Sequence, residues 1–215
     1  FYTLPDVTIA KGKATGGSVI SLLSETLPPG NYLLPVSLSG LSGQGDASIN
    51  IDKQTVANYF VIKQGSPINR DHWTVTANTE EKTGETSAAY PHNGQTVSLI
   101  DGEVNTFWHS QWQGGEVAPP YEIILDMGKE NSVSQLGLIA RQNALTSMNL
   151  EIYAGNDGET WNLIGKYFFD GSIKTEQMVP VKACDARWLR IYIPSLGSGS
   201  SVGHLAELYV YGTDK

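Results

Sequence analysis

The feature that most constrains this chain is a two-residue alternation of apolar side chains, in short segments bounded by glycine, proline, asparagine or aspartate. Within Tyr121–Met127 the large apolar residues occupy every second position, and the same pattern recurs within Arg187–Ile193. Every second side chain of a β-strand points to the same face. The only helix that the pattern predicts is a turn near Val97–Gly102. The sequence therefore predicts an all-β fold, an antiparallel β-sandwich.

The predicted strands fall into two blocks. The first block holds Val7–Ile9, Ser18–Leu23, Tyr32–Leu38 and Tyr59–Lys63. The second holds Trp73–Ala77, Tyr121–Met127, Val133–Ala140, Leu150–Ala154, Trp161–Tyr167, Arg187–Ile193 and Glu207–Tyr211. Between them, glycine and proline in Gln64–Pro67 interrupt strand pairing. We predict a first domain at 1–65, a linker at 66–70 and a second domain at 71–215.

The net charge limits the classes of binding partner, and the cysteine content limits the possible disulfides. The net charge is −8 and the pI is about 4.9, so the surface repels nucleic-acid phosphates and anionic lipid, whereas a neutral sugar is compatible. Cys184 is the only cysteine, which excludes an intrachain disulfide. The chain begins at Phe1, which we interpret as a trimmed N-terminus. Contact with a membrane is then expected only through an anchor lost with the missing segment.

Five motifs occur in order along the second block: LIDGEVNTFWHSQW at 99–112, PPYEIILDMGKENSVSQLGLIARQ at 119–142, LEIYAGNDGETWNLIG at 150–165, ARWLRIYI at 186–193 and HLAELYVYG at 204–212. Together they resemble the F5/8 type C (discoidin) domain, and within that family the family 32 carbohydrate-binding modules. The resemblance implies a galactose-binding-like jelly roll that holds a glycan on its loops and performs no catalysis.

The first block carries YTLPDVTIAKGKATGGSVISL and LPPGNYLLPVSL within Tyr2–Leu38. This segment resembles the later half of an Ig-like domain from secreted or lipid-anchored surface proteins of glycan-degrading bacteria. The resemblance implies a smaller Ig-like β-sandwich, incomplete at its N-terminal side. It also implies an extracellular or outer-surface location.

A cation site is the first site that the resemblance implies. Calcium binds six to eight hard oxygens from carboxylates, hydroxyls and carbonyls. By resemblance, a structural Ca²⁺ would bind the side chains of Asp101, Thr106 and Glu207, with the backbone carbonyls of Leu99, Val104 and Ala206 as further candidates. The alternative from the residues alone is that Asp101 opens a turn and that Glu207 is an exposed strand carboxylate.

A sugar site is the second site that the resemblance implies. A sugar offers hydroxyl edges and an apolar C–H face, so its site needs planar polar groups and an aromatic platform. By resemblance, His109 and Arg141 reach the hydroxyls, Asn143 adds a contact from the loop of Arg141, and Trp112 and Tyr90 form the platform or rim. The resemblance implies a galactose-containing glycan. The loop at 197–203, where some relatives carry an aromatic residue, has none here.

Three functions remain open at this point. The leading prediction is a non-catalytic carbohydrate-binding protein that supports polysaccharide capture or utilisation. The alternatives are a cell-adhesion or protein-binding discoidin domain without a functional sugar site, and a structural spacer. The segment Gly199–Gly203 matches the G-x-S-x-G nucleophile pattern, but a predicted strand follows where that motif needs a helix, so no enzyme is predicted. The sequence leaves the oligomeric state open.

Overall fold

The computed structural model describes residues 2–3, 21–22, 30–36, 56–62, 65–197 and 200–215, and its contacts divide the chain into two units, Phe1–Ile62 and Lys63–Lys215. The first unit contains two antiparallel pairs, β1 (Tyr2–Thr3) with β2 (Ser21–Leu22) and β3 (Gly30–Val36) with β4 (Val56–Ile62). The predicted strand at Val7–Ile9 lies outside the described residues. The Ig-like character of this unit stays a prediction.

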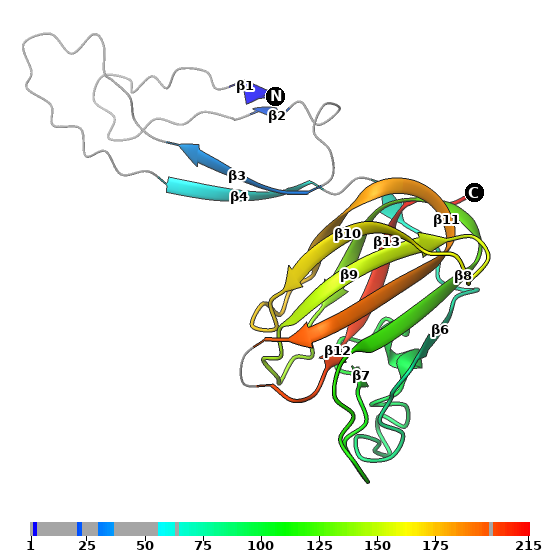
Figure 1. Cartoon of the computed structure of the whole chain (residues 1–215). Coiled ribbons are helices and arrows are strands. Elements are labelled where there is room, and N and C mark those ends of the chain that lie inside the picture. Colours follow the sequence, from blue (N-terminus) through cyan, green and yellow to red (C-terminus); the bar gives the residue numbers. More distant parts are fainter. Residues whose placement is uncertain (1, 4–20, 23–29, 37–55, 63–64, 198–199) are drawn as a thin grey trace, which may run out of the picture. The chain divides into compact units, whose positions relative to one another are not determined.

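The second unit is built almost entirely of antiparallel strands (Figure 1). They are β5 (Ser66–Pro67), β6 (Thr74–Ala77), β7 (Trp108–His109), β8 (Tyr121–Ile139), β9 (Met148–Gly155), β10 (Asn162–Phe169), β11 (Gln177–Leu196), β12 (His204–Leu205) and β13 (Glu207–Thr213). One short 3-10 helix, η2 (Thr96–Leu99), lies where the sequence predicted a helical turn. No helix in the described part of the chain has the length and apolarity to cross a membrane.

Two long strands, β8 and β11, connect the two layers of the sandwich. The first half of β8 pairs with β6 and with the segment Trp188–Ile193 of β11, and this part of β11 also pairs with β9. The second half of β8 pairs with β13 and with the beginning of β11. Register shifts in β11 mark the change of layer, as expected where a bulge bends a strand. The result is the antiparallel jelly-roll sandwich that the sequence predicted.

The alternating apolar residues form the core between the layers. Tyr121, Ile123, Leu125 and Met127 on β8 are all buried, as are the apolar residues at every second position of β11 from Leu189 to Ile193. Trp108 is fully buried and its ring meets Tyr121 edge to face at 5.9 Å. Burial of each large side chain contributes about 1.5–3 kcal/mol, so this core can hold the end loops in place.

Three details of the sequence prediction were wrong. The predicted linker at 66–70 belongs to the second unit, because β5 pairs with β13 and Ile68 is buried and donates its N–H to Val210. The separate strands predicted at Tyr121–Met127 and Val133–Ala140 are one strand, because β8 pairs with β11 on both sides of its exposed middle, across a register shift. The beginning of β11 was missed, because its exposed residues break the two-residue alternation.

Candidate functional site

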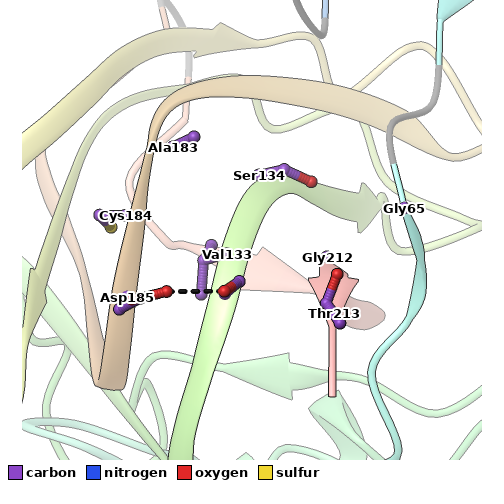
Figure 2. A pocket seen from close by; sticks show the side chains of 9 residues that line it. Gly65, Val133, Ser134, Ala183, Cys184, Asp185, Gly212 and Thr213 are labelled. Atoms are coloured by element: carbon purple, nitrogen blue, oxygen red, sulfur yellow. Dashed lines mark hydrogen bonds between the residues drawn. The ribbon is translucent and has the colours of Figure 1, made fainter. Parts of the chain in front are cut away.

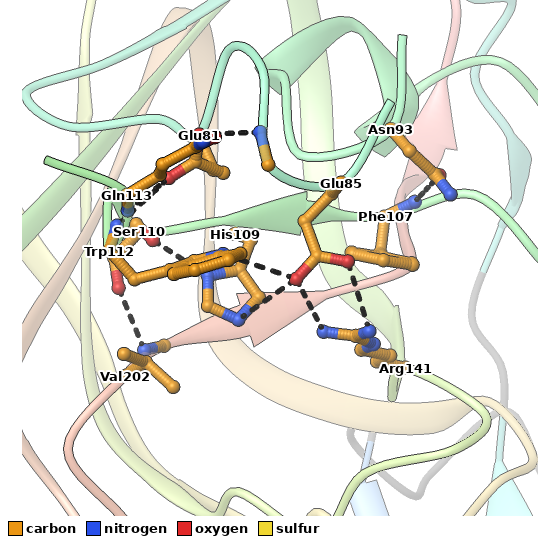
Figure 3. A network of polar contacts seen from close by, with 12 residues as sticks. Glu81, Glu85, Asn93, Phe107, His109, Ser110, Trp112, Gln113, Arg141 and Val202 are labelled. Carbon is orange, nitrogen blue, oxygen red and sulfur yellow. Dashed lines mark hydrogen bonds and ion pairs between the residues drawn. The ribbon is translucent and has the colours of Figure 1, made fainter. Parts of the chain in front are cut away.

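Three loops meet at one end of the second unit, around the carboxylate of Glu85. Glu85 lies in the long loop after β6, His109 ends β7, and Arg141 follows β8. Arg141 Nη2 lies 3.2 Å from Glu85 Oε2 and Nη1 lies 3.5 Å from Oε1. His109 Nε2 lies 3.8 Å from Glu85 Oε1. Figure 3 shows Glu85 between the imidazole and the guanidinium, so the predicted His109–Arg141 pair is brought together through a residue that the sequence analysis missed.

His109 is held as a neutral ring. Its Nδ1 lies 2.6 Å from the carbonyl oxygen of Ser110, an atom that can only accept, so Nδ1 carries the proton and Nε2 keeps its lone pair. Burial lowers the pKa of His109 below its usual value. The buried ring of His204 lies 5.5 Å from that of His109, centroid to centroid, and burial lowers its pKa to about 3. Two neutral imidazoles therefore lie buried next to each other.

Arg141 is fixed from two sides. Its guanidinium carbon lies 3.8 Å from the centroid of the Phe107 ring, in cation–π contact. Behind its loop, the ammonium of Lys174 donates to the carbonyl oxygens of Arg141, Ala144 and Gly171, the first at 2.9 Å and the last at 2.6 Å. The charge is thus presented by a loop with little freedom to move.

Trp112 supplies an aromatic surface beside this charged centre. Its side chain is 42% exposed, and its indole Nε1 donates to Glu85 Oε1 at 3.2 Å. The ring packs against Gly84, where a Cβ would lie only 2.6 Å from Trp112 Cζ2. One part of the ring is therefore supported by the backbone of Gly84, while much of the remainder stays open to solvent.

Glu81, a residue that the sequence analysis did not single out, ties two of the loops together. Its side chain is buried, and its Oε1 accepts from the N–H groups of Thr83 and Gly84 at 3.1 and 2.8 Å. Its Oε2 accepts from the N–H groups of Trp112 and Gln113 at 3.0 and 2.8 Å. Burial raises the pKa of Glu81, but these donors outweigh burial and lower it to about 2. Figure 3 shows the carboxylate against the Trp112 loop.

A hollow of about 320 Å³ lies beside Arg141. Its lining is rich in side-chain amides and consists of Glu85, Tyr90, Asn93, Asn105, Phe107, Arg141, Gln142 and Asn143. The structure therefore places the predicted residues Tyr90 and Asn143 on this hollow. Phe107 and Asn93 were missed; Phe107 directly precedes the Trp108–His109 strand, and this adjacency was the available signal.

The predicted cation residues gather at a second place. Thr106 Oγ1 lies 2.8 and 3.0 Å from the two carboxylate oxygens of Asp101. Glu207 Oε1 accepts from the N–H of Gly102 at 2.8 Å, and its Oε2 accepts from Arg70 at 2.6 Å. Glu207 is fully buried, so the alternative of an exposed strand carboxylate is wrong. Burial raises its pKa to about 7, with Arg70 opposing and Asp101 reinforcing the shift.

The three carbonyl candidates flank this cluster. Leu99 ends η2 and is buried, Val104 has a side chain 38% exposed, and Ala206 is buried between β12 and β13. No group of three or more His, Cys, Asp or Glu side chains spaced for a metal occurs among the residues that the structure describes. An ion bound here would therefore depend on the Thr106 hydroxyl and on backbone carbonyls for most of its oxygens.

A larger hollow lies elsewhere and has a different character. It measures about 440 Å³ and is lined by Gly65, Ser132, Val133, Ser134, Ala183, Cys184, Asp185, Gly212 and Thr213 (Figure 2). Asp185 accepts from the Ser132 hydroxyl at 2.6 Å and pairs with Lys215 at 2.7 Å. This lining contains no aromatic ring, so chemistry favours the smaller hollow beside Arg141 as the ligand site.

Comparison with known proteins agrees with this geometry. A family model of the F5/8 type C domain matches residues 74–208. A sialidase from Micromonospora viridifaciens is 34% identical over 206 residues, which cover 94% of this chain but 29% of the sialidase. The chain therefore spans less than a third of that relative.

Solved structures show the same fold. The C-terminal domain of a chitobiase from Bacteroides fragilis superposes with a TM-score of 0.60 at 34% identity, covering 69% of this chain and 98% of that domain. The family 32 carbohydrate-binding module of NanJ from Clostridium perfringens, solved with galactose, superposes with a TM-score of 0.55 at 27% identity, covering 67% of this chain and 97% of the module.

Proposed function

This chain belongs to the F5/8 type C domain family, and from that premise we propose that its second unit is a non-catalytic carbohydrate-binding module. The observation that carries the proposal is the convergence of His109, Arg141 and Glu85 beside the exposed Trp112 ring. Hydroxyl groups of a sugar can donate to Glu85 and to His109 Nε2 and accept from Arg141. The apolar C–H face of the same sugar can pack on Trp112.

The carboxylates near the site support binding over catalysis. General acid catalysis needs a carboxyl group that keeps its proton near neutral pH. The pKa of Glu81 is instead lowered to about 2, and its oxygens are occupied by backbone N–H groups. Glu85 is held by Arg141 and Trp112. Glu81 therefore holds the loops of the site together, and Glu85 takes part in ligand recognition.

We place the module outside the cell or on its outer surface, where it would hold a polysaccharide or glycan for partner enzymes. The support is that the similar module of NanJ was solved with galactose and that the similar sialidase is several times longer than this chain. A galactose-containing glycan is the first ligand to test. Because a loop site open to solvent buries only part of its ligand, we expect modest affinity.

Glycan-array screening followed by calorimetric titration of the hits tests this function. The variants His109→Ala, Arg141→Ala and Trp112→Ala should each weaken binding by tenfold or more. Leu145→Ala is the matched control, because Leu145 lies on the loop of Arg141 with its side chain 74% exposed. If the unaltered protein binds no glycan better than the His109→Ala/Arg141→Ala double variant, the alternative of an adhesion or protein-binding domain gains support.

We also propose that Asp101, Thr106 and Glu207 hold a structural Ca²⁺, with Leu99, Val104 and Ala206 as carbonyl donors. A cation would suit this cluster, because a fully buried Glu207 with its pKa raised to about 7 sits beside a second carboxylate. When bound, the ion would supply positive charge that joins the loop at 101–106 to the start of β13. A ligand bound only by the folded state raises the melting temperature, so calcium should raise it and a chelator should lower it. Equal melting temperatures under both conditions would contradict the site.

A further inference from the structure

The ligand site contains one cation that faces its centre, and that cation is already paired. Both terminal nitrogens of Arg141 face the two oxygens of Glu85, at 3.2 and 3.5 Å. One face of the guanidinium is covered by Phe107 at 3.8 Å. The exposed fractions of the two side chains are only 23% and 18%, so the pair is poorly screened by water. A ligand therefore meets a neutralised Arg141 and the remaining lone pairs of Glu85.

Three further polar groups close to Glu85 or to the Arg141 loop are also occupied. The proton on His109 Nδ1 is directed to Ser110, and the indole N–H of Trp112 is donated to Glu85. The ammonium of Lys174 is directed to the backbone carbonyls behind the Arg141 loop. Glu81 adds a second negative charge, which acts on His109 together with Glu85. Two carboxylates therefore act on the centre, and within the described part of the chain the one cation that faces it is already paired.

We propose that Glu85 is the specificity-determining residue of this site: it admits neutral sugars through their hydroxyls and rejects sugars that bring a carboxylate to the centre. This inference rests on the proposed carbohydrate-binding function. A hydroxyl can donate to Glu85, whereas a ligand carboxylate can only accept and carries the same charge. To reach Arg141, an acidic ligand must first break the Arg141–Glu85 pair. Glu85 then faces a ligand of the same charge, so the site discriminates against acidic sugars by repulsion.

Calorimetric titration of the full chain with paired probes tests the inference. The neutral probes are galactose, glucose and mannose, and each is compared with its uronic acid at low ionic strength. For the neutral sugar that binds best, the matching uronic acid should bind at least tenfold more weakly. The methyl ester of that uronic acid, which keeps the shape and loses the charge, should bind within about threefold of the neutral sugar.

Two variants assign the effect to one carboxylate. Glu85→Gln removes the charge at constant size and should reduce the neutral-to-acid ratio to threefold or less. Glu116→Gln removes the same charge from an exposed position in the neighbouring loop after β7 and should leave the ratio unchanged. This control separates Glu85 from the general effect of the −8 net charge.

The possible results are distinct. Equal binding of the acid and the neutral sugar, or exclusion of the ester together with the acid, overturns the role of Glu85. An unchanged ratio in Glu85→Gln overturns it as well. If Glu85→Gln binds nothing, the ester comparison on the unaltered protein still decides. Failure of every probe on the unaltered protein would instead refute the proposed function on which the inference rests.

Discussion

Replacement of Glu81 by glutamine should destabilise the second unit and weaken ligand binding together. The carboxylate accepts from four backbone N–H groups, two in the loop after β6 and two in the loop after β7. A glutamine can offer its single oxygen to one of these pairs. Its amide hydrogens then face the other pair, so two buried donors lose their partner.

The magnitude follows from the pKa of Glu81. This pKa falls from 4.5 to about 2 on folding, and each unit corresponds to about 1.4 kcal/mol, so the ionised group contributes about 3 kcal/mol at neutral pH. Because the folded pKa is depressed, the contribution is complete above about pH 4.5 and is lost as the pH falls toward 2. For a domain of this size, 3 kcal/mol corresponds to a decrease in melting temperature of roughly 6–12 °C.

Chemical denaturation of Glu81→Gln at pH 7 and at pH 3 measures this effect, with Glu159→Gln as the control. Glu159 is an exposed glutamate outside the site loops, and its replacement should change the free energy of unfolding by less than about 0.5 kcal/mol. The loss in Glu81→Gln should be smaller at pH 3 than at pH 7. A loss that does not depend on pH, or one no larger than that of the control, would refute the role of the ionised carboxylate.

Three further predictions concern the loops. Lys174→Met removes the donor to two carbonyls of the Arg141 loop and to the carbonyl of Gly171. It should lower stability by about 2–3 kcal/mol in urea unfolding, with a larger loss of glycan affinity than Leu145→Ala. Equal affinities of the two variants would contradict a positioning role. Gly84→Ala places a methyl group 2.6 Å from Trp112 Cζ2, so the indole must move. Glycan affinity should fall about tenfold, a loss of about 1.4 kcal/mol, while the contacts of His109 and Arg141 with Glu85 remain. Glu207→Gln should abolish any calcium-dependent rise in melting temperature, whereas Glu103→Gln, in the loop that carries Asp101 and Thr106, should retain it.

Much of the fold was predictable because the patterns that indicate it lie within short segments of the sequence. The two-residue alternation at Tyr121–Met127 reports burial on one face, and the structure confirms that burial. The motifs from Leu99 to Gly212 predicted the F5/8 type C family, and the family match confirms it. The linker was placed wrongly because Gly65 and Pro67 look like strand breakers, whereas β5 is a short edge strand whose pairing with β13 depends on residues far along the chain.

The centre of the site was harder to predict because its key acid has no local signal. Glu85 lies in a polar loop whose sequence resembles any solvated turn. Its importance arises only when Trp112, His109 and Arg141 are brought to it from two other segments. The same applies to Glu81, whose sequence neighbours do not reveal the N–H groups that fold around it. In the sequence, a carboxylate that is hydrated at the surface looks the same as one whose hydrogen-bond partners are protein groups. Its partners decide its function, and here those partners are set by the closure of two distant loops over the sandwich end.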